Sequence, residues 1–301
     1  IEPNLLEELI NQYLPLLHTT RKKRSLPFKD DKILVSWNAL MIDALMKAGL
    51  TLNDPTYCAA AIKGAEFIKN HLWKNKTLKR RFREGHTDFE GCLDDYAALI
   101  RALLTLFEGG AGTHYLKWAI EMTYLLESQF KADEGAFYLT SLNHSILLHR
   151  CELYDGPQPS GNALHTENLI RLYQITKHRE FLIQAEDILK VAKSYIESSP
   201  QGAYYHLANL QLYNDKQAKV FIIALNAKES YKENISSLLF SYFTPHTRVI
   251  WKFSDDEELG NLVPSLKEYV PIDGETTVYQ LLQGECTTQT NNWEEIKKLL
   301  N

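Results

Sequence analysis

Three polar segments of the sequence hold the side chains that could transfer protons or bind a ligand. They are residues 21–40, 86–99 and 149–169. Carboxylates on neighbouring loops can act as general acid and base, and we expect this role for Asp95 and Asp155. Other polar and aromatic side chains of these segments can hold and orient a ligand, which gives a predicted binding set of Asp31, Trp37, Asn38, Tyr96, Arg150 and Asn162. We predict that all of these residues gather at one end of a helical stack.

Several of these side chains also have a purely structural interpretation. Asp94 and Asp95 would be favoured at the start of a helix by the helix macrodipole alone. Ser160 is best interpreted as an N-cap, because the nucleophile motif GxSxG is missing around it. Trp37 and Trp118 lie on apolar stripes and are expected in the core, with a sugar-stacking surface as the alternative.

Histidine and cysteine patterns do not predict a metal or another cofactor. The ten histidines contain no HExxH motif, and no two of them have metal-ligand spacing. The cysteines form no CxxC pair, which is typical of a reducing compartment and indicates a cytoplasmic location; they are Cys58, Cys92, Cys151 and Cys286.

Charge and hydropathy exclude two classes of partner. The 301 residues carry a formal net charge of −5, so a broad positive field for nucleic acid is absent. No apolar run reaches the roughly 18 to 20 residues that a membrane span needs, and no secretory signal opens the chain. We therefore expect a soluble protein with no nucleic-acid or membrane partner. The first residue is Ile1 rather than Met, so we also expect that the chain begins within a longer protein and that part of the domain is missing.

Apolar residues recur at offsets of three and four along the first 199 residues, which predicts helices. The helices pair through short turns, so neighbours in each pair must be antiparallel. Three such hairpins are expected, at residues 37–72, 96–126 and 160–196. This repeat of roughly 60 residues predicts a mainly α fold, the second half of an (α/α)6 toroid at residues 1–199.

The pattern of apolar and polar residues changes after Pro200. Residues 219–225 read KVFIIAL, a short apolar run typical of a buried strand. Further strands are expected at 247–253 and 276–282, with helices at 235–242 and 293–300. This order predicts a small α/β lobe at residues 200–301.

Three motifs give the chain a family resemblance. The pattern R-x-K-R-x-x-P-x-x-D-D-K-x-L-x-x-W-N-x-L-M-I is matched from Arg21 to Ile42, L-x-D-Y-A from Leu93 to Ala97, and P-S-G-N from Pro159 to Asn162. The chain thereby resembles thioredoxin-domain-containing proteins of the YyaL and spermatogenesis-associated type. The resemblance implies a thioredoxin-like domain, then a toroid similar to N-acylglucosamine 2-epimerase and other six-hairpin enzymes, of which this chain would be the second half and the tail.

Two functions are compatible with these patterns. The first is a carbohydrate-active module of the epimerase or isomerase type, in which carboxylates or a histidine move protons. The second is a non-catalytic interaction module that presents a client or ligand to a thioredoxin-like domain. Expected partners are a saccharide and either the missing N-terminal half or an oligomer mate, because three hairpins leave apolar flanks uncovered.

Overall fold

The computed structural model describes residues 2–226, 232–240 and 246–300. Contacts within the chain divide it into two compact units, Ile1–Lys32 and Ile33–Asn301. This division lies at residues 32 and 33, whereas the sequence suggested a domain boundary at 199 and 200.

The first unit consists mainly of helix α1 (Pro3–Lys22), which begins with a proline and ends in basic residues. None of its side chains is buried. Seven of its large apolar side chains are half or nearly half exposed, whereas Leu9 is partly buried; the seven are Leu5, Leu6, Ile10, Tyr13, Leu14, Leu16 and Leu17.

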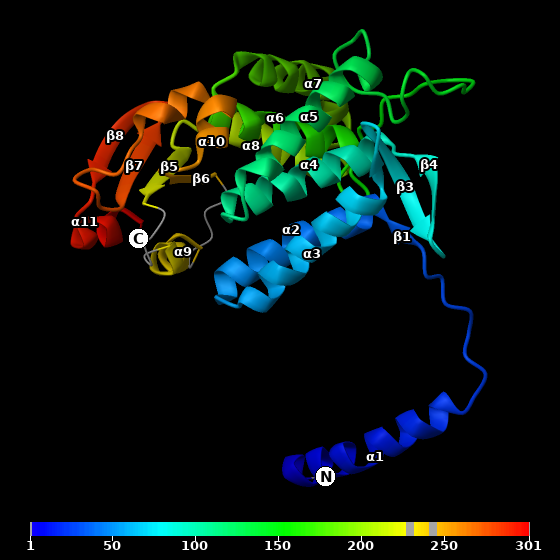
Figure 1. Ribbon diagram of the computed structural model, residues 1–301. Coiled ribbons are helices and arrows are strands. Elements are labelled where there is room, and N and C mark those ends of the chain that lie inside the picture. The colour runs from blue at the N-terminus through cyan, green and yellow to red at the C-terminus, as the bar shows by residue number, and fades with distance from the viewer. Residues whose placement is uncertain (1, 227–231, 241–245, 301) are drawn as a thin grey trace. The chain divides into compact units, whose positions relative to one another are not determined.

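Within its described residues, the second unit contains the three predicted helical hairpins (Figure 1). They pair α2 (Val35–Leu52) with α3 (Pro55–His71), α4 (Leu93–Glu108) with α5 (Thr113–Phe130), and α6 (Gly161–Thr176) with α7 (Arg179–Ser198). Helix α4 packs between α2 and α6, so these three form an inner row, and α3, α5 and α7 form the outer layer. Helix α8 (Tyr204–Asn214) packs on α6 and extends the inner row.

Local signals explain where these helices begin. Asp54 caps α3 by accepting the Thr56 N–H, with Pro55 in the first turn. Ser160 caps α6 by accepting the Ala163 N–H, which confirms the N-cap expected from the sequence.

A small antiparallel sheet connects the first two hairpins and was not predicted. Strand β3 (Thr77–Arg83) pairs with β1 (Ile33–Leu34), β2 (Trp73–Lys74) and β4 (His86–Glu90). The strands of this sheet carry many basic and polar residues, so their sequences lack the apolar alternation that marks a half-buried strand.

In the C-terminal lobe, two of the predicted strands form a parallel pair. Strand β5 (Lys219–Leu225) runs parallel to β6 (Arg248–Phe253), with α9 (Lys232–Phe240) between them in sequence. Strands β7 (Thr277–Leu282) and β8 (Glu285–Thr290) extend the sheet in the order β6-β5-β7-β8, and β7 is antiparallel to β5. Helices α10 (Glu257–Leu262) and α11 (Trp293–Leu300) complete the lobe, with short 3-10 turns at Pro200–Gly202 and Pro264–Glu268.

Both faces of β5 are buried, which accounts for its unbroken apolar sequence. Successive strand residues point to opposite faces. Val220, Ile222 and Ala224 belong to the large helical core. Phe221, Ile223 and Leu225 belong to a second core with α9 and α11.

The second unit is therefore mainly helical, with the hairpin architecture of an α/α toroid followed by an α/β lobe. Figure 1 shows the β3–β4 hairpin beside the first turn of α4 and the lobe beside its last turn. The lobe contact is direct, because the Trp251 indole N–H donates to the carbonyl of Glu108 at 2.8 Å.

Candidate functional site

Hydrogen bonds bring the first turns of the inner helices to one end of the second unit. The Ser36 N–H donates to Asp95 Oδ1 at 3.1 Å, which joins α2 to α4. The Gly161 N–H bonds to the Asp94 carboxylate, which joins α4 to α6. The Tyr205 N–H donates to Asp155 Oδ2 at 2.8 Å, which joins α8 to the loop before α6.

Asp95 is fully buried, and donors occupy both of its oxygens. Besides the Ser36 N–H, it accepts the Cys92 N–H at 3.0 Å and the Arg80 guanidinium at 2.9 Å. These bonds cap α4 and fix strand β3 against it. The carboxylate that the sequence suggested as an acid or base thus has three structural partners.

Asp155 is also buried and bonded on both oxygens. Its Oδ1 accepts the Ser160 N–H at 2.9 Å, and its Oδ2 accepts the N–H groups of Tyr205 and His206. The Ser160 Oγ lies 3.3 Å from His206 Nε2, so serine, histidine and aspartate meet here. They do not form a catalytic triad, because Asp155 contacts the backbone of His206 rather than its Nδ1.

Two further residues from the predicted set are buried anchors. The Tyr96 hydroxyl accepts the Leu78 N–H at 3.0 Å and so holds β3. The Asn162 side chain bonds to both backbone groups of Phe137 and to the carbonyl of Glu152. Both buried side chains therefore hold neighbouring backbone segments in place at this end of the inner row.

The remaining predicted residues lie at the surface. Trp37 is 60 % exposed, so the expectation that it belongs to the core is wrong, whereas Trp118 is buried as expected. Trp37 and Met41 share a side of α2 that neither α3 nor α4 covers. Asn38 donates to the carbonyl of Leu34 at 2.7 Å. Arg150 pairs with Glu152 at 3.4 Å in an exposed position.

Asp31 belongs to the first compact unit and not to the second, in which the other predicted residues lie. Its side chain is exposed.

Asp94 is the carboxyl group at this end whose side chain is partly open and whose pKa is raised. Burial raises its pKa first, and the charge of Asp95 raises it further. Arg80 and the Gly161 N–H act in the opposite direction, and the charge of Glu152 adds to the rise. A carboxyl group in this state retains a proton to higher pH than an exposed aspartate does.

A layer of charged side chains lies about 10 Å deeper along the inner helices, two turns of α4 beyond Asp94. Arg101 bonds to Asp43 at 2.9 Å and to Glu167 at 3.0 Å, and the Tyr205 hydroxyl donates to Glu167 at 2.5 Å. Burial alone would raise the pKa of Glu167, but Arg101, followed by Arg171, holds it down at about 2. None of these residues was singled out from the sequence.

The same stripe of α4 ends at Glu108, one further pair of turns along. Glu108 accepts hydrogen bonds from Arg171 of α6 at 3.3 Å and from Arg248 of β6 at 3.4 Å. Asp94, Arg101 and Glu108 are spaced by seven residues, which places them on one side of the helix. This spacing was the available signal for an inner polar stripe.

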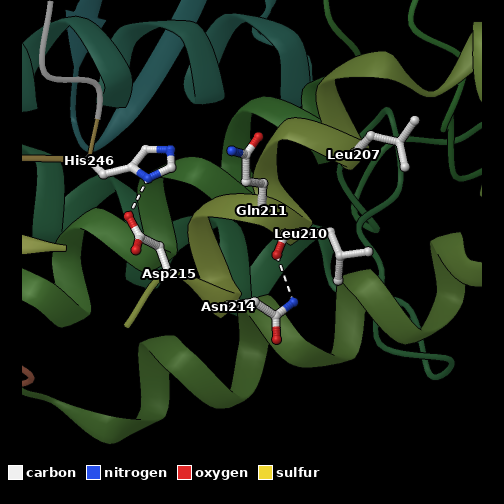
Figure 2. A pocket seen from close by; sticks show the side chains of 6 residues that line it. All are labelled: Leu207, Leu210, Gln211, Asn214, Asp215 and His246. Atoms are coloured by element: carbon white, nitrogen blue, oxygen red, sulfur yellow. Dashed lines mark hydrogen bonds and ion pairs between the residues drawn. The ribbon is translucent and has the colours of Figure 1, made fainter. Parts of the chain in front are cut away.

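A separate hollow of about 520 Å3 lies along α8, from Leu207 to Asp215 just beyond the end of the helix (Figure 2). It is lined by Leu207, Leu210, Gln211, Asn214, Asp215 and His246. His246 Nδ1 bonds to Asp215. None of these residues was singled out from the sequence.

The described ranges contain no group of three or more histidine, cysteine, aspartate or glutamate side chains placed to hold a metal ion. They also contain no helix that is long and apolar enough to cross a membrane.

Comparison with known proteins supports the resemblance found in the sequence. No protein-family model matches the chain. Spermatogenesis-associated protein 20 of Rattus norvegicus is 25% identical over 315 residues, which cover 100% of this chain and 40% of the relative. The chain is similar to this protein along its whole length. The human protein of the same name is 25% identical over 307 residues, 97% of this chain and 39% of its own. The chain thus spans about two fifths of the curated relatives it matches.

Solved structures with a similar arrangement are carbohydrate enzymes by name. The GH76 α-mannanase BT2949 of Bacteroides thetaiotaomicron has a TM-score of 0.47 and 13% identity, covering 72% of this chain and 59% of its own. Cellobiose 2-epimerase of Spirochaeta thermophila has a TM-score of 0.45 and 17% identity, covering 55% of this chain and 44% of its own. These likenesses concern the fold alone.

Proposed function

We propose that this chain supplies one wall of a carbohydrate-active site, in which Asp94 transfers a proton at the first turn of α4. The observation that carries the proposal is the state of Asp94: a partly open carboxyl group with a raised pKa, set where α4 and α6 begin. A carboxyl group that keeps its proton nearer to neutral pH is suited to general acid catalysis. This is the chemistry that sugar hydrolysis, epimerisation and isomerisation share.

Asp95 and Asp155 then act as positioning residues instead of the acid and base suggested by the sequence. Each is buried with both oxygens bonded, so neither can reach a ligand without losing the contacts that hold a helix start in place. Asp95 also contributes to the state of its neighbour, because its charge raises the pKa of Asp94.

Glu152 is the proposed partner carboxylate. Its side chain is 37 % exposed, and its charge acts on Asp94, which requires the two groups to be near each other. Two carboxyl groups that flank a ligand can divide the roles of acid and base between them.

Ligand contacts are proposed for the exposed members of the predicted set. The open ring of Trp37 offers an apolar face on which the C–H side of a sugar can lie. The exposed side chains of Asn38 and Arg150 provide hydrogen-bond donors. Tyr96 and Asn162 hold the backbone of Leu78 and Phe137 in place. Asp31 stays a predicted contact.

The whole protein is the proposed working unit, with the rest of the longer chain as partner. Trp37 and Met41 are more than half exposed on the inner row, and further hairpins of a toroid would face them. The described cysteines are free thiols, which suits the cytoplasmic location that we propose for it.

An interaction role is the alternative, and α1 favours it. Seven of its large apolar side chains are exposed, as expected of a helix that packs against another protein segment. In that case the first turns of the inner helices would bind peptide or protein instead of sugar.

Hydrogen–deuterium exchange of the whole protein distinguishes these two functions. With a neutral saccharide present, the carbohydrate proposal expects slower exchange in residues 35–38, 92–96 and 160–163. Exchange that is unchanged by every saccharide tested, but slowed in these segments by peptides, would contradict it and support the alternative.

A further inference from the structure

The hollow along α8 has two kinds of lining. Leu207 and Leu210 form an apolar part, and Gln211 and Asn214 follow on the same side of the helix with amide groups. His246 and Asp215 complete the wall (Figure 2). Its volume of about 520 Å3 lies within the range of small-molecule sites.

The histidine is oriented by its carboxylate partner. The pKa of Asp215 is lowered by the hydrogen bond from the Gln217 N–H and then by His246. The ionised carboxylate therefore accepts a hydrogen bond from the Nδ1–H of His246. The second ring nitrogen lies away from Asp215, on the side of Gln211 in Figure 2. A histidine held in this way presents Nε2 in a fixed direction.

The polar atoms left to a ligand are both donors and acceptors. The Asn214 Nδ2 donates to the carbonyl of Leu210 at 2.8 Å, which leaves its Oδ1 as an acceptor. Gln211 offers an amide N–H and a carbonyl oxygen. His246 Nε2 accepts when the ring is neutral and donates when it is charged. A hydroxyl group satisfies each of these atoms, because it is a donor and an acceptor at once.

Charged ligands fit this lining less well. Among the residues that the structure describes, no lysine or arginine lines the hollow, and an anion would meet the Asp215 carboxylate. A cation would find both Asp215 oxygens already bonded, to the Gln217 N–H and to His246. The described residues also offer no metal-holding cluster.

We propose that this hollow binds a neutral polyhydroxylated molecule of the size of a monosaccharide. Leu207 and Leu210 contact its C–H face, and Gln211, Asn214 and His246 bond its hydroxyl groups. The site is distinct from the one at Asp94, because its lining shares no residue with the groups that act on Asp94, which are Asp95, Arg80, Gly161 and Glu152. It therefore does not depend on the reaction proposed above.

The test follows hydrogen–deuterium exchange in Tyr204–Asn214 of the whole protein. The probes are glucose, mannose and N-acetylglucosamine as neutral sugars, and glucuronate and glucosamine as charged ones. We expect the neutral sugars to slow exchange in α8 saturably and the charged ones to do so less. A comparison of the protection by glucose and by maltotriose distinguishes binding of a free sugar from binding of the end of a longer glycan.

Gln211→Ala should lower the apparent affinity of the neutral sugars, measured from the concentration dependence of this protection, about tenfold. This is the loss expected for one hydrogen bond to a ligand. Gln201→Ala, an exposed glutamine outside the hollow, should leave this affinity unchanged. Equal affinities of the two variants would overturn the proposal, as would protection by charged sugars only. Protection of α8 with none at residues 92–96 would support this site while counting against the function proposed for Asp94, so the two failures are separable.

Discussion

The backbone N–H of Ser36 donates to Asp95 Oδ1 at 3.1 Å, across 59 positions of the sequence. Asp95 also accepts the N–H of Cys92, three residues before it, so one carboxylate joins the starts of α2 and α4. The neighbouring Asp94 is left partly open. The division of roles between these two aspartates leads to the first prediction.

Asp95→Ala should destabilise the protein by about 3 kcal/mol, because it removes the partner of Arg80 and leaves two helix-start N–H groups without their acceptor. Asp94→Asn should change the free energy of unfolding by less than about 1 kcal/mol. Urea unfolding of both variants measures the difference. Equal losses would mean that Asp94 has a structural role as large as that of Asp95.

Glu108→Ala should cost about 3 kcal/mol or more, because Arg171 and Arg248 share this carboxylate within the interior. Glu258→Ala is the matched control, since its pair with Lys117 is exposed to solvent and should contribute far less. Thermal unfolding of the two variants tests this. A loss as small as that of the control would show that the lobe does not depend on Glu108 for its attachment to α4.

His165 should make the protein less stable in acid. It is fully buried, neither ring nitrogen has a hydrogen-bond partner among the described residues, and burial lowers its pKa to about 3. The unfolded chain takes up the proton near pH 6.5, so the stability that His165 contributes is complete above that pH and declines as the pH falls from 6.5 towards 3. Between pH 7 and pH 5 the loss is about 2 kcal/mol.

His165→Leu should remove this loss while keeping the contact with Phe137. His86→Leu, at an exposed position of β4, should retain it. Urea unfolding at pH 7 and pH 5 gives the difference for each variant. If His165→Leu shows the same decline as the original protein, the imidazole titrates normally and is accessible to water.

Much of the fold could be predicted because helix periodicity is local. The apolar stripes of α4 and α5 and the unbroken apolar strand β5 each follow from spacing along a short segment. Strand β8 has the polar sequence ECTTQT and lies in the lobe as an exposed strand, so it carries no such signal. Trp37 lies on an apolar stripe as well, but periodicity does not say which neighbour covers a stripe.

The candidate site was harder to predict, because it depends on where side chains point in three dimensions. Asp94 and Asp95 are adjacent in sequence, yet a turn of about 100° between them buries one and leaves the other partly open. The layer around Arg101 was missed because charged residues on a helix usually indicate a solvated face. The hollow at His246 joins residues more than 30 positions apart, which no local pattern reveals.

The pH dependence of any turnover follows from the raised pKa of Asp94. If Asp94 is the general acid, activity should persist above the pH at which an ordinary aspartate is ionised and should decline as its own raised pKa is passed. Arg80→Gln removes a positive charge that holds this pKa down, so the decline should move to higher pH. A pH–rate profile that is unchanged in Arg80→Gln would argue against Asp94 as the acid.

The most direct test of Asp94 is turnover of neutral sugars by the whole protein in deuterated water. Proton NMR follows both deuterium entry into the sugar ring and the release of new reducing ends. We expect one of these signals, reduced about a hundredfold or more by Asp94→Asn and unchanged by Asp133→Asn, an exposed aspartate elsewhere. Turnover that Asp94→Asn leaves intact would contradict the proposal.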